Sequence, residues 1–497
     1  MIYMKLVIRL CIAALLMWLS ACAAPSPASG PSAAAELPAG LPDGRRWLQH
    51  LTEDLLPFWT NEAALGEPLG NFPSTRCNNG SQVNRADPCP EVGRNPWLMM
   101  NRNYVVSMSR QTYGYGVAFH LTGDPRYLRF AKAGVNYLRQ NAFDRQNGST
   151  FAYWDGDRGT WGPEPAYRNP QELAYALLGI GFYYYLTRDP EVLPDILKAK
   201  DYIFKRYYNP QLNALQWMLA STGDAQATDK HLVAQLDQLN AYLVLLTPLL
   251  PEPHRAQWRE DAVRLAHILI DEFYSAEDNS FFLRANSPDE RSLRVAGTDF
   301  GHTIKAFWMI RLVGLLAGQP DLVAFAEANG PRVLERAFLA DSGSWASTIR
   351  KGGQLNPDKD WWMYAELDQF AATMALKDPA LTRYLARTAE YYFTHFIDHE
   401  HGEVWTSLDA ATNRPPPEAL PKAWPWKSAY HSFEHALVGY ITAQQLRGEP
   451  VTLYYAFDQT PDGTTIRPYF YRAGPPRLDV RVSEGVVIYK AQFTGVH

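Results

Sequence analysis

The pattern of apolar and polar positions along this chain predicts a series of paired helices. Apolar residues recur every three or four positions on both sides of a repeated polar turn, and before the first turn they are Tyr113, Val117 and Leu121. The residue before a proline disfavours the helical conformation, and proline suits the first turn of a helix. Each of these turns is therefore expected to end one helix and begin the next. The turns reach their prolines at Pro125, Pro190, Pro253, Pro320, Pro379 and Pro450.

These turns divide the chain into six helical hairpins. Six hairpins can close into a ring with one helix of each pair inside, so the expected fold is all-α, an (α/α)6 barrel. An open helical solenoid is the alternative, but its terminal helices would need a polar cap that is not obvious here. The twelve helices are expected at about 43–65, 103–122, 125–142, 169–187, 190–207, 230–250, 254–274, 300–317, 321–339, 361–376, 379–399 and 428–447.

The pattern changes at both ends of the chain. Segments 451–457, 467–471 and 486–489 are rich in aromatic and β-branched residues, which predicts strands and a β-rich extension over 450–497, after a barrel domain at 43–449. At the other end, Lys5 and Arg9 precede an apolar run too short to span a bilayer comfortably, which predicts a signal peptide over 1–22. Residues 23–42, rich in Ala, Pro, Ser and Gly, are expected to form a flexible tether.

The end of this signal region, Leu19-Ser20-Ala21-Cys22, resembles the lipobox of bacterial lipoproteins. The resemblance implies that Cys22 is acylated, becomes the mature N-terminus and anchors the protein to a membrane. Ala23 follows the cysteine, which by the same resemblance implies the outer membrane, with the protein facing the periplasm or the exterior. An ordinary signal peptide with an incidental cysteine is the alternative.

Composition and cysteine content narrow the function classes. The net charge is −5 with no basic field, so nucleic-acid binding is not expected. Aromatic residues make up 13% of the chain, which suits a large core and also the aromatic platforms of carbohydrate clefts. Cys77 and Cys89 lie in a polar loop of a chain expected to leave the cytoplasm, so a disulfide is expected, with two free buried thiols as the alternative. This pair alone offers too few ligands for a metal site.

Polar side chains recur in the first half of the helices that precede the proline turns. If these helices form the inner ring, their polar residues converge on one end of the barrel and can form an acid–base site. The residues are Arg110, Gln171, Glu172, Asp237, His302, Glu366 and His431.

Four segments carry a resemblance to a known family. They are residues 109–113 (Ser-Arg-Gln-Thr-Tyr), 301–308 (Gly-His-Thr-Ile-Lys-Ala-Phe-Trp), 361–366 (Trp-Trp-Met-Tyr-Ala-Glu) and 426–431 (Trp-Lys-Ser-Ala-Tyr-His). Their order and spacing resemble the N-acylglucosamine 2-epimerase superfamily, which includes cellobiose 2-epimerases and aldose–ketose isomerases. The resemblance implies an (α/α)6 barrel, a carbohydrate substrate, and a reaction at C2 of a reducing sugar without a metal or another cofactor.

The resemblance also implies roles for individual residues. The proton on C2 beside an open-chain carbonyl is weakly acidic, so the reaction needs a base, a cation near the enediolate oxygen, and a second acid–base group. His302 and His431 are the implied proton-transfer pair, and Arg110 is the implied enediolate clamp. The expected sugar-binding residues are Tyr113, Asp237, Lys305, Trp361, Trp362, Glu366 and Trp426.

Three positions depart from the family pattern. Lys305 stands where the family has the Glu of a His-x-x-Glu motif, so the carboxylate that orients His302 is expected to be lost. Asp237 stands where many members have another histidine, and Asn240, three residues later, stands where they have a glutamate. Glu434 stands where an arginine is common. A pair between Lys305 and Asp237 would keep the charge of the pocket balanced.

Other function classes remain open at this point. Export favours a glycoside hydrolase or polysaccharide lyase, for which Asp237, Asp299 and Glu366 are candidate carboxylates. A non-catalytic glycan-binding lipoprotein, derived from an enzyme that has lost its activity, is a second alternative. Residues 431–435 also fit the His-x-x-Glu-His motif of some zinc peptidases, but no third ligand is apparent in the short β-rich tail that follows. The sequence specifies neither the sugar nor the oligomeric state.

Overall fold

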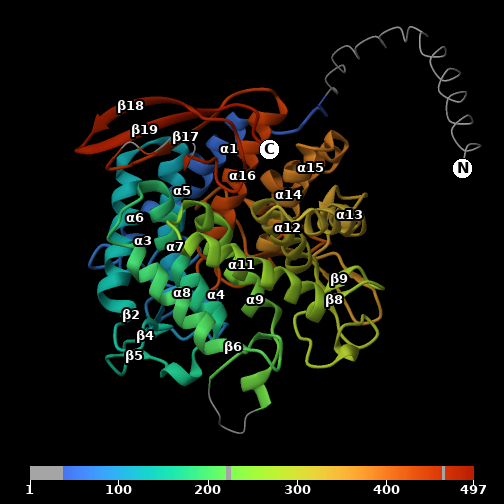
Figure 1. Ribbon diagram of the computed structural model, residues 1–497, viewed down its shortest axis with the longest axis horizontal. Helices are drawn as coiled ribbons and strands as arrows, with labels where there is room; N and C mark the ends of the chain where they lie inside the picture. The colour runs from blue at the N-terminus through green and yellow to red at the C-terminus, as the bar shows by residue number, and fades with distance from the viewer. Residues whose placement is uncertain (1–36, 220–224, 460, 462–464) are drawn as a thin grey trace, which may run out of the picture. The chain divides into compact units, whose positions relative to one another are not determined.

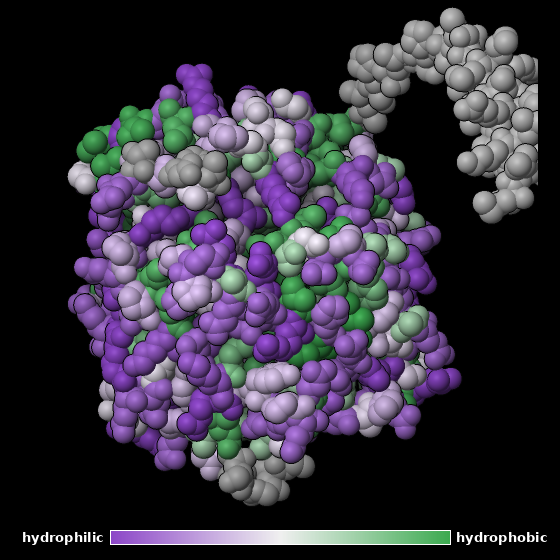
Figure 2. Space-filling model, viewed as in Figure 1, coloured by the Kyte–Doolittle hydropathy of each residue, from purple (hydrophilic) through white to green (hydrophobic). Residues whose placement is uncertain are grey.

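The computed structural model describes residues 37–219, 225–459, 461 and 465–497 (Figure 1). The expected signal peptide, its lipidation residue Cys22 and the tether up to residue 36 lie outside the described residues. The face shown in Figure 2 is mostly hydrophilic, with scattered apolar patches.

Six helical segments form a closed inner ring, which confirms the expected (α/α)6 barrel. Each segment packs against the next, and the last, α16, packs against the first, α5. Because these segments have neighbours on all sides, almost all of their side chains are buried. The inner segments are α5 (Val105–Thr122), α7 (Pro170–Thr187), α9 (Leu232–Gln238) continued by η5 (Leu239–Leu243), α10 (Val244–Leu246) and η6 (Thr247–Leu249), α12 (Phe300–Ala317), α14 (Trp361–Ala375) and α16 (Tyr430–Leu446).

A second layer of helices covers the inner ring. The N-terminal helices pack on α16, and the remaining outer helices pack on the inner helices that they follow or precede in the chain. The outer elements are α1 (Gly44–Gln49), η1 (His50–Leu55), α2 (Leu56–Thr60), α3 (Glu62–Leu65), α6 (Pro125–Tyr137), η2 (Leu138–Ala142), α8 (Leu193–Tyr207), α11 (His254–Ile268), η7 (Leu269–Phe273), α13 (Pro320–Ala337), η9 (Pro379–Leu381), α15 (Thr382–Tyr391) and η10 (Tyr392–Phe396).

Several of the repeated turns have the local structure that their residues predict, but α8 begins only at Leu193, three residues after Pro190, and Pro450 is followed by strand β17. At the first turn, Gly123 ends α5 with a φ of +67°, a left-handed conformation that glycine adopts without strain. Asp124 then caps α6, because its side chain accepts a hydrogen bond from the backbone N–H of Arg126 at 2.9 Å, and Pro125 occupies the first helical position. Arg188 ends α7 in the same left-handed conformation, with a φ of +57°. These turns reverse the chain between the two layers.

Short strands join the helices at one end of the barrel, where Figure 1 shows β4, β5, β6, β8 and β9 below the ring. The described strands of this kind are β1 (Arg102–Tyr104), β2 (Phe143–Asp144), β3 (Ser149–Thr150), β4 (Tyr153–Asp155), β5 (Thr160–Gly162), β6 (Tyr208–Asn209), β7 (Ala214–Leu215), β8 (Tyr274–Ser275), β9 (Ser280–Phe281), β10 (Thr298–Asp299), β11 (Phe338–Leu339), β12 (Ser344–Trp345), β13 (Thr348–Ile349), β14 (Leu355–Asn356), β15 (Lys359–Asp360) and β16 (Ser407–Leu408). Four short helical segments, α4 (Pro90–Gly93), η3 (Pro165–Tyr167), η4 (Ala225–Thr228) and η8 (Pro288–Glu290), lie in the loops.

The chain after the barrel forms a small antiparallel sheet, as the sequence predicts. Its strands are β17 (Val451–Tyr455), β18 (Arg477–Ser483) and β19 (Val486–Phe493), with β19 in the middle. They lie at the end of the barrel opposite the short strands (Figure 1).

The strand expected at 467–471 is wrong, because this segment forms a turn between β17 and β18. The segment is rich in aromatic residues because these side chains are buried against the inner helices. They do not alternate across a sheet. We call residues 465–472 the plug. Tyr469 contacts α5, α7 and α16, Phe470 packs on Trp308 of α12, and the Tyr471 hydroxyl hydrogen-bonds to Thr373 of α14. The plug therefore closes one end of the ring.

Candidate active site

A cavity of about 360 Å³ opens at the end of the barrel where the inner segments begin. All six inner segments contribute to it, always from their N-terminal half. Five of the seven polar residues predicted to converge line the cavity, and Glu172 and Glu366 do not. Two loops complete the wall. The lining residues are Arg110, Gln171, Tyr175, Asp237, His302, Lys305, Asp360, Trp361, Trp362, Thr406, Leu420, Trp424, Trp426 and His431.

His302 is oriented by the carboxylate of Asp299, a residue outside the family's His-x-x-Glu motif. Asp299 caps α12: its Oδ1 accepts from the backbone N–H of His302 at 2.6 Å, and its Oδ2 lies 2.8 Å from the ring Nδ1. The expectation that His302 loses its orienting carboxylate is therefore wrong, because the residue three positions before it replaces the one three positions after it. Since Nδ1 is held by Asp299, Nε2 is the ring atom left for proton transfer with a ligand.

His431 occupies a more buried position on the same cavity. Its ring packs on Trp362, with 5.8 Å between ring centroids, and Trp362 also contacts His302 at 4.6 Å. One indole therefore touches both imidazoles. Burial lowers the pKa of His431 well below its ordinary value of 6.5, and the positive charges of Arg110 and Lys305 act in the same direction. His431 is accordingly neutral at pH 7 and can accept a proton.

Arg110 supplies a positive charge that no carboxylate neutralises within the described part of the chain. Its Nη1 donates to the backbone oxygen of Trp426 at 2.5 Å, and its guanidinium lies 3.9 Å from the centre of the Tyr175 ring. These contacts fix the group in place but leave its charge available to an anionic oxygen in the cavity.

Lys305 and Asp237, which both depart from the family pattern, form the expected pair that balances the charge of the pocket. The Lys305 Nζ lies 2.9 Å from Asp237 Oδ1, and both side chains are almost fully buried. Gln171 and Tyr175 also donate to the same carboxylate, at 2.9 and 3.0 Å. Burial opposes the charge on each partner, but the attraction between them outweighs it, so the pKa of Lys305 is raised and that of Asp237 is lowered. The pair is therefore ionised.

Two of the expected sugar-binding residues do not line the cavity. Glu366 is fully buried below His431, with its Oε1 3.4 Å from the imidazole Nδ1 and 4.0 Å from the Lys305 Nζ. Burial raises the pKa of Glu366 to about 8. Tyr113 is also fully buried, and its hydroxyl donates to that of Tyr469 in the plug at 3.1 Å. Both residues support the cavity from the inside of the ring, whereas Trp361, Trp362 and Trp426 line it.

Sequence reasoning missed several lining residues, among them Tyr175, Asp360, Thr406, Leu420 and Trp424. Asp360 precedes α14 and accepts a hydrogen bond from the backbone N–H of Trp362 at 3.4 Å. Burial raises the pKa of Asp360 to about 8, which favours the protonated carboxyl, the form that can donate to a sugar oxygen. The position of Asp360 directly before Trp361 and Trp362, as the N-cap of a predicted inner helix, was a sequence signal that could have placed it at the cavity. The burial of its carboxyl was not readable from sequence.

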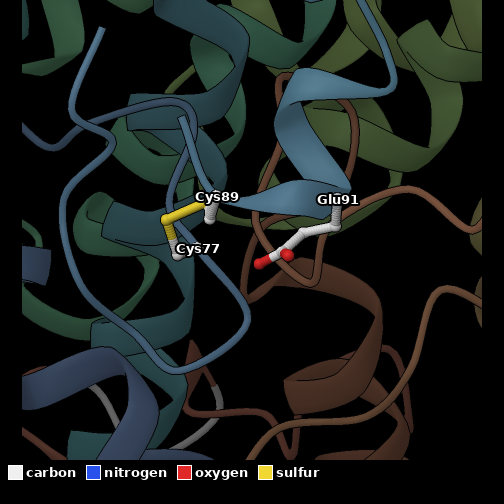
Figure 3. A group of neighbouring side chains, drawn as sticks. All are labelled: Cys77, Cys89 and Glu91. Atoms are coloured by element: carbon white, nitrogen blue, oxygen red, sulfur yellow. A yellow bond between two sulfur atoms is a disulfide. The ribbon is translucent and has the colours of Figure 1, made fainter. Parts of the chain in front are cut away.

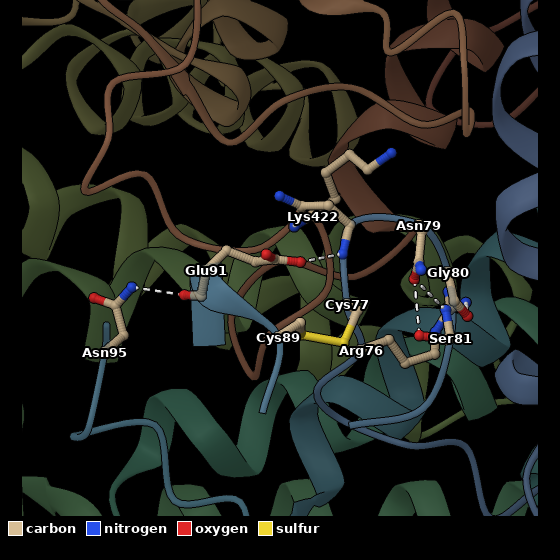
Figure 4. The surroundings of a disulfide bond; sticks show 10 residues. Arg76, Cys77, Asn79, Gly80, Ser81, Cys89, Glu91, Asn95 and Lys422 are labelled. Atoms are coloured by element: carbon tan, nitrogen blue, oxygen red, sulfur yellow. Dashed lines mark hydrogen bonds between the residues drawn. A yellow bond between two sulfur atoms is a disulfide. The ribbon is translucent and has the colours of Figure 1, made fainter. Parts of the chain in front are cut away.

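The expected disulfide between Cys77 and Cys89 is present, with Glu91 beside it (Figure 3). Because the two sulfurs are bonded to each other, they are not thiolate ligands for a metal. The Glu91 carboxylate accepts from the backbone N–H of Asn78 at 2.6 Å, within the same loop (Figure 4).

This disulfide loop supports one wall of the cavity. Asn78 accepts a hydrogen bond from the backbone N–H of Lys422 at 2.8 Å, and the backbone N–H of Arg76 donates to Ala423 at 3.1 Å. The ring of Trp97, in the chain just after the loop, contacts Trp424 with 5.8 Å between centroids. The segment that follows Lys422 carries Trp424 and Trp426, so the loop holds the tryptophan wall against the cavity.

Three residues at the base of the cavity carry side-chain atoms that could coordinate a metal ion. Donor atoms of Glu366, His431 and Glu434 all lie within 4.8 Å of one another, and all three residues are buried. This spacing fits the ligands of a cation, but the ammonium of Lys305 already places a positive charge 4.0 Å from Glu366.

The sequence model of N-acylglucosamine 2-epimerase (GlcNAc 2-epimerase) matches residues 94–435. The chain belongs to the N-acylglucosamine 2-epimerase family. Its relatives are epimerases and isomerases of sugars, which supports an enzyme of this broad class.

Individual relatives are similar over most of their length. Cellobiose 2-epimerase of Bacteroides fragilis is 22% identical over 399 residues, which are 77% of this chain and 95% of that protein. The structure of cellobiose 2-epimerase from Bacillus thermoamylovorans B4167 superposes with a TM-score of 0.66 at 18% identity, over 80% of this chain and 98% of that one. A D-mannose isomerase structure gives 0.64 at 18% identity, over 82% and 99%. At these identities the structural likeness shows the shared fold.

Proposed function

We propose that this protein is a sugar 2-epimerase or aldose–ketose isomerase that acts through an enediolate at C2 of a reducing sugar. The observation that carries the proposal is that His302, His431 and Arg110 meet at one cavity, and that no carboxylate among the described residues forms an ion pair with Arg110. Proton removal beside a carbonyl needs a base and a cation near the developing oxyanion, and this cavity offers both. The sugar epimerases and isomerases among the relatives support the same reaction class.

The chemistry follows from the state of each group. Neutral His431 takes the proton from C2, the C–H electrons form a double bond between C1 and C2, and the carbonyl oxygen becomes an enediolate oxygen that Arg110 stabilises. His302, held by Asp299, returns a proton through Nε2. Return to C2 from the opposite face gives the epimer. Return to C1, with the proton of the C2 hydroxyl passing to the C1 oxygen, gives the ketose. Protonated Asp360 donates a hydrogen bond to a sugar hydroxyl or carbonyl oxygen.

The three carboxylates that the sequence suggests for a hydrolase are poorly placed for hydrolysis, and Asp360 is the other carboxyl group among the described residues that line the cavity. Hydrolysis would use two of Asp237, Asp299 and Glu366, one as an acid and the other as a base or nucleophile. Of these three, only Asp237 lines the cavity, and Lys305 holds it in an ion pair. Asp299 is occupied by His302, and Glu366 lies below the cavity surface.

Incubation with mannose, glucose, N-acetylmannosamine and cellobiose in heavy water tests the proposal. A turnover that passes through an enediolate should place deuterium at C2 of substrate or product, or at C1 of a ketose, as seen by NMR. His302→Asn and His431→Asn should each reduce this exchange by orders of magnitude, whereas the control variant His399→Asn, at an exposed position, should not. Release of new reducing ends from polysaccharides, or sugar binding without exchange, would contradict the proposal and support a hydrolase or a glycan-binding protein.

We also propose that the protein is exported and anchored to the outer membrane through Cys22, which rests on the sequence of the signal region alone. In the native host, the wild-type protein should be found in the outer-membrane fraction, and Cys22→Ser should release it or block its processing. An equal distribution of the two proteins between membrane and soluble fractions would show that Cys22 is not an anchor.

A further inference from the structure

A second cavity, of about 310 Å³, lies at the end of the barrel opposite the candidate active site. α12 reaches both cavities: its N-terminal half carries His302 and Lys305, and its C-terminal half lines the second cavity. The plug and α11 form the other walls. The lining residues are Val244, Thr247, Pro248, Arg255, Arg259, Arg311, Leu312, Leu315, Leu316, Arg467, Phe470, Tyr471, Arg472 and His497.

Five of these residues are arginines, although the chain as a whole carries a net charge of −5. Glu327 neutralises Arg311 at 3.0 Å, and Glu252 lies 3.7 Å from Arg255. Within the described part of the chain, no carboxylate forms an ion pair with the other three, which are Arg259, Arg467 and Arg472.

The three arginines without an ion pair in the described part of the chain gather at this cavity, where Arg467 is half-buried and Arg259 and Arg472 are exposed. Burial lowers the pKa of Arg467 to about 10, and Arg472 acts in the same direction, so the group stays charged at pH 7 in an unfavourable place. The main chain of Arg472 is fixed by two hydrogen bonds of 2.9 Å to His497. Gathering cations in this way costs free energy unless an anion offsets it.

The chemical nature of the lining residues limits the class of ligand that can bind. Guanidinium groups present paired N–H donors that match the oxygens of phosphate, which makes arginine a common phosphate ligand. Beside these donors lie Leu312, Leu315 and Phe470, which offer an apolar surface to the rest of a ligand. We propose that this cavity binds a phosphate-bearing anion through Arg259, Arg467 and Arg472. The phosphate can belong to a soluble anion or to the headgroup of a lipid. This site does not depend on the reaction proposed for the first cavity.

Calorimetry with inorganic pyrophosphate and with the soluble short-chain lipid dihexanoyl phosphatidic acid tests the site on the full chain. We expect at least one of the two to bind, with an affinity that falls as the salt concentration rises. The double variant Arg259→Gln/Arg472→Gln should weaken that binding about tenfold or more, because each charge-assisted contact to phosphate is strong. Arg467 is left intact because it is more buried, so a variant there could lose the fold instead of the ligand.

Two controls separate this site from general charge effects. Arg206→Gln removes an exposed arginine from another outer helix, α8, and Arg110→Gln removes the guanidinium of the first cavity. Both should bind the anion as the wild-type chain does. Binding of pyrophosphate alone identifies a soluble anion, and binding of phosphatidic acid but not of dihexanoyl phosphatidylcholine identifies a lipid phosphate. No binding of either probe, or equal affinity in the double variant, would overturn the proposal.

Discussion

His431 lies where a positive charge would be costly, between a buried carboxyl, two cationic side chains and three aromatic rings. His302 lies at the cavity edge with its Nδ1 fixed by Asp299. The two imidazoles therefore have different environments, which suits different roles in one proton transfer. Burial and hydrogen bonding around each ring set these roles, and the identity of the residues alone does not.

The protonation of His431 can be measured directly. Because burial and Arg110 lower its pKa, the neutral form should persist as the pH falls through 6.5, and protonation should follow only at lower pH. Ring nitrogen shifts in the NMR spectrum of labelled protein report this transition. Arg110→Gln removes one of the repelling charges, so its midpoint should move to higher pH. A wild-type midpoint at or above 6.5 would show that His431 is not the neutral base.

The Lys305–Asp237 pair should behave as a buried ion pair. Lys305→Met leaves the Asp237 carboxylate buried without its main partner, which should lower the free energy of unfolding by about 3–5 kcal/mol. The double variant Lys305→Met/Asp237→Asn removes both charges and should lose less than the sum of the single changes. Unfolding in urea measures all four proteins. Strictly additive losses would mean that the two residues do not interact.

At the scale of elements, the hairpin pattern was predictable because its causes are local. Asp124 and Pro125 favour a helix start through their own capping and backbone preferences, and the apolar spacing on either side specifies the buried faces. The orientation of His302 was not predictable, because Asp299 lies in a β-strand before the helix and the family motif draws attention to Lys305 instead. The plug was misread as a strand because an aromatic run looks the same in either structure. Its burial depends on the closed ring, which is a long-range property.

The disulfide loop should affect substrate binding more than the chemical step. Cys77→Ala/Cys89→Ala opens a loop with a sequence separation of 12, which should lower the free energy of unfolding by about 3 kcal/mol. It should also raise KM, because the wall with Trp424 and Trp426 loses support, while kcat changes little. Treatment of the wild-type chain with a reductant should reproduce both effects and should not alter the variant. An unchanged KM would show that the tryptophan wall is independent of the loop.

At the scale of the whole molecule, the plug links the C-terminal sheet to the underside of the active site. The Tyr469 hydroxyl donates to the buried Glu434 carboxylate, one turn after His431, and the Tyr469 N–H donates to Tyr185 at 2.8 Å. Tyr469 adopts a φ of +59°, which is uncommon for a bulky residue and persists only when its surroundings hold it. The closed end of the barrel is therefore built from both parts of the chain.

This link predicts unequal effects of two similar variants. Tyr469→Phe removes a donor to a buried carboxylate and should lower the free energy of unfolding by about 1–3 kcal/mol. Tyr471→Phe removes only a bond to the neutral hydroxyl of Thr373 and should cost about 1 kcal/mol or less. Urea unfolding of both variants tests this order. A larger loss for Tyr471→Phe would contradict the role given to Tyr469.

The position of C2 between the two imidazoles is the claim on which the proposed reaction depends. A crystal structure with a linear sugar alcohol, which resembles the open-chain substrate but lacks a carbonyl to react, measures that position directly. We expect C2 within about 3.5 Å of the nearest ring nitrogen of both His302 and His431, on opposite faces, with a neighbouring oxygen bound to Arg110. A sugar alcohol bound elsewhere, or with C2 out of reach of both rings, would contradict it.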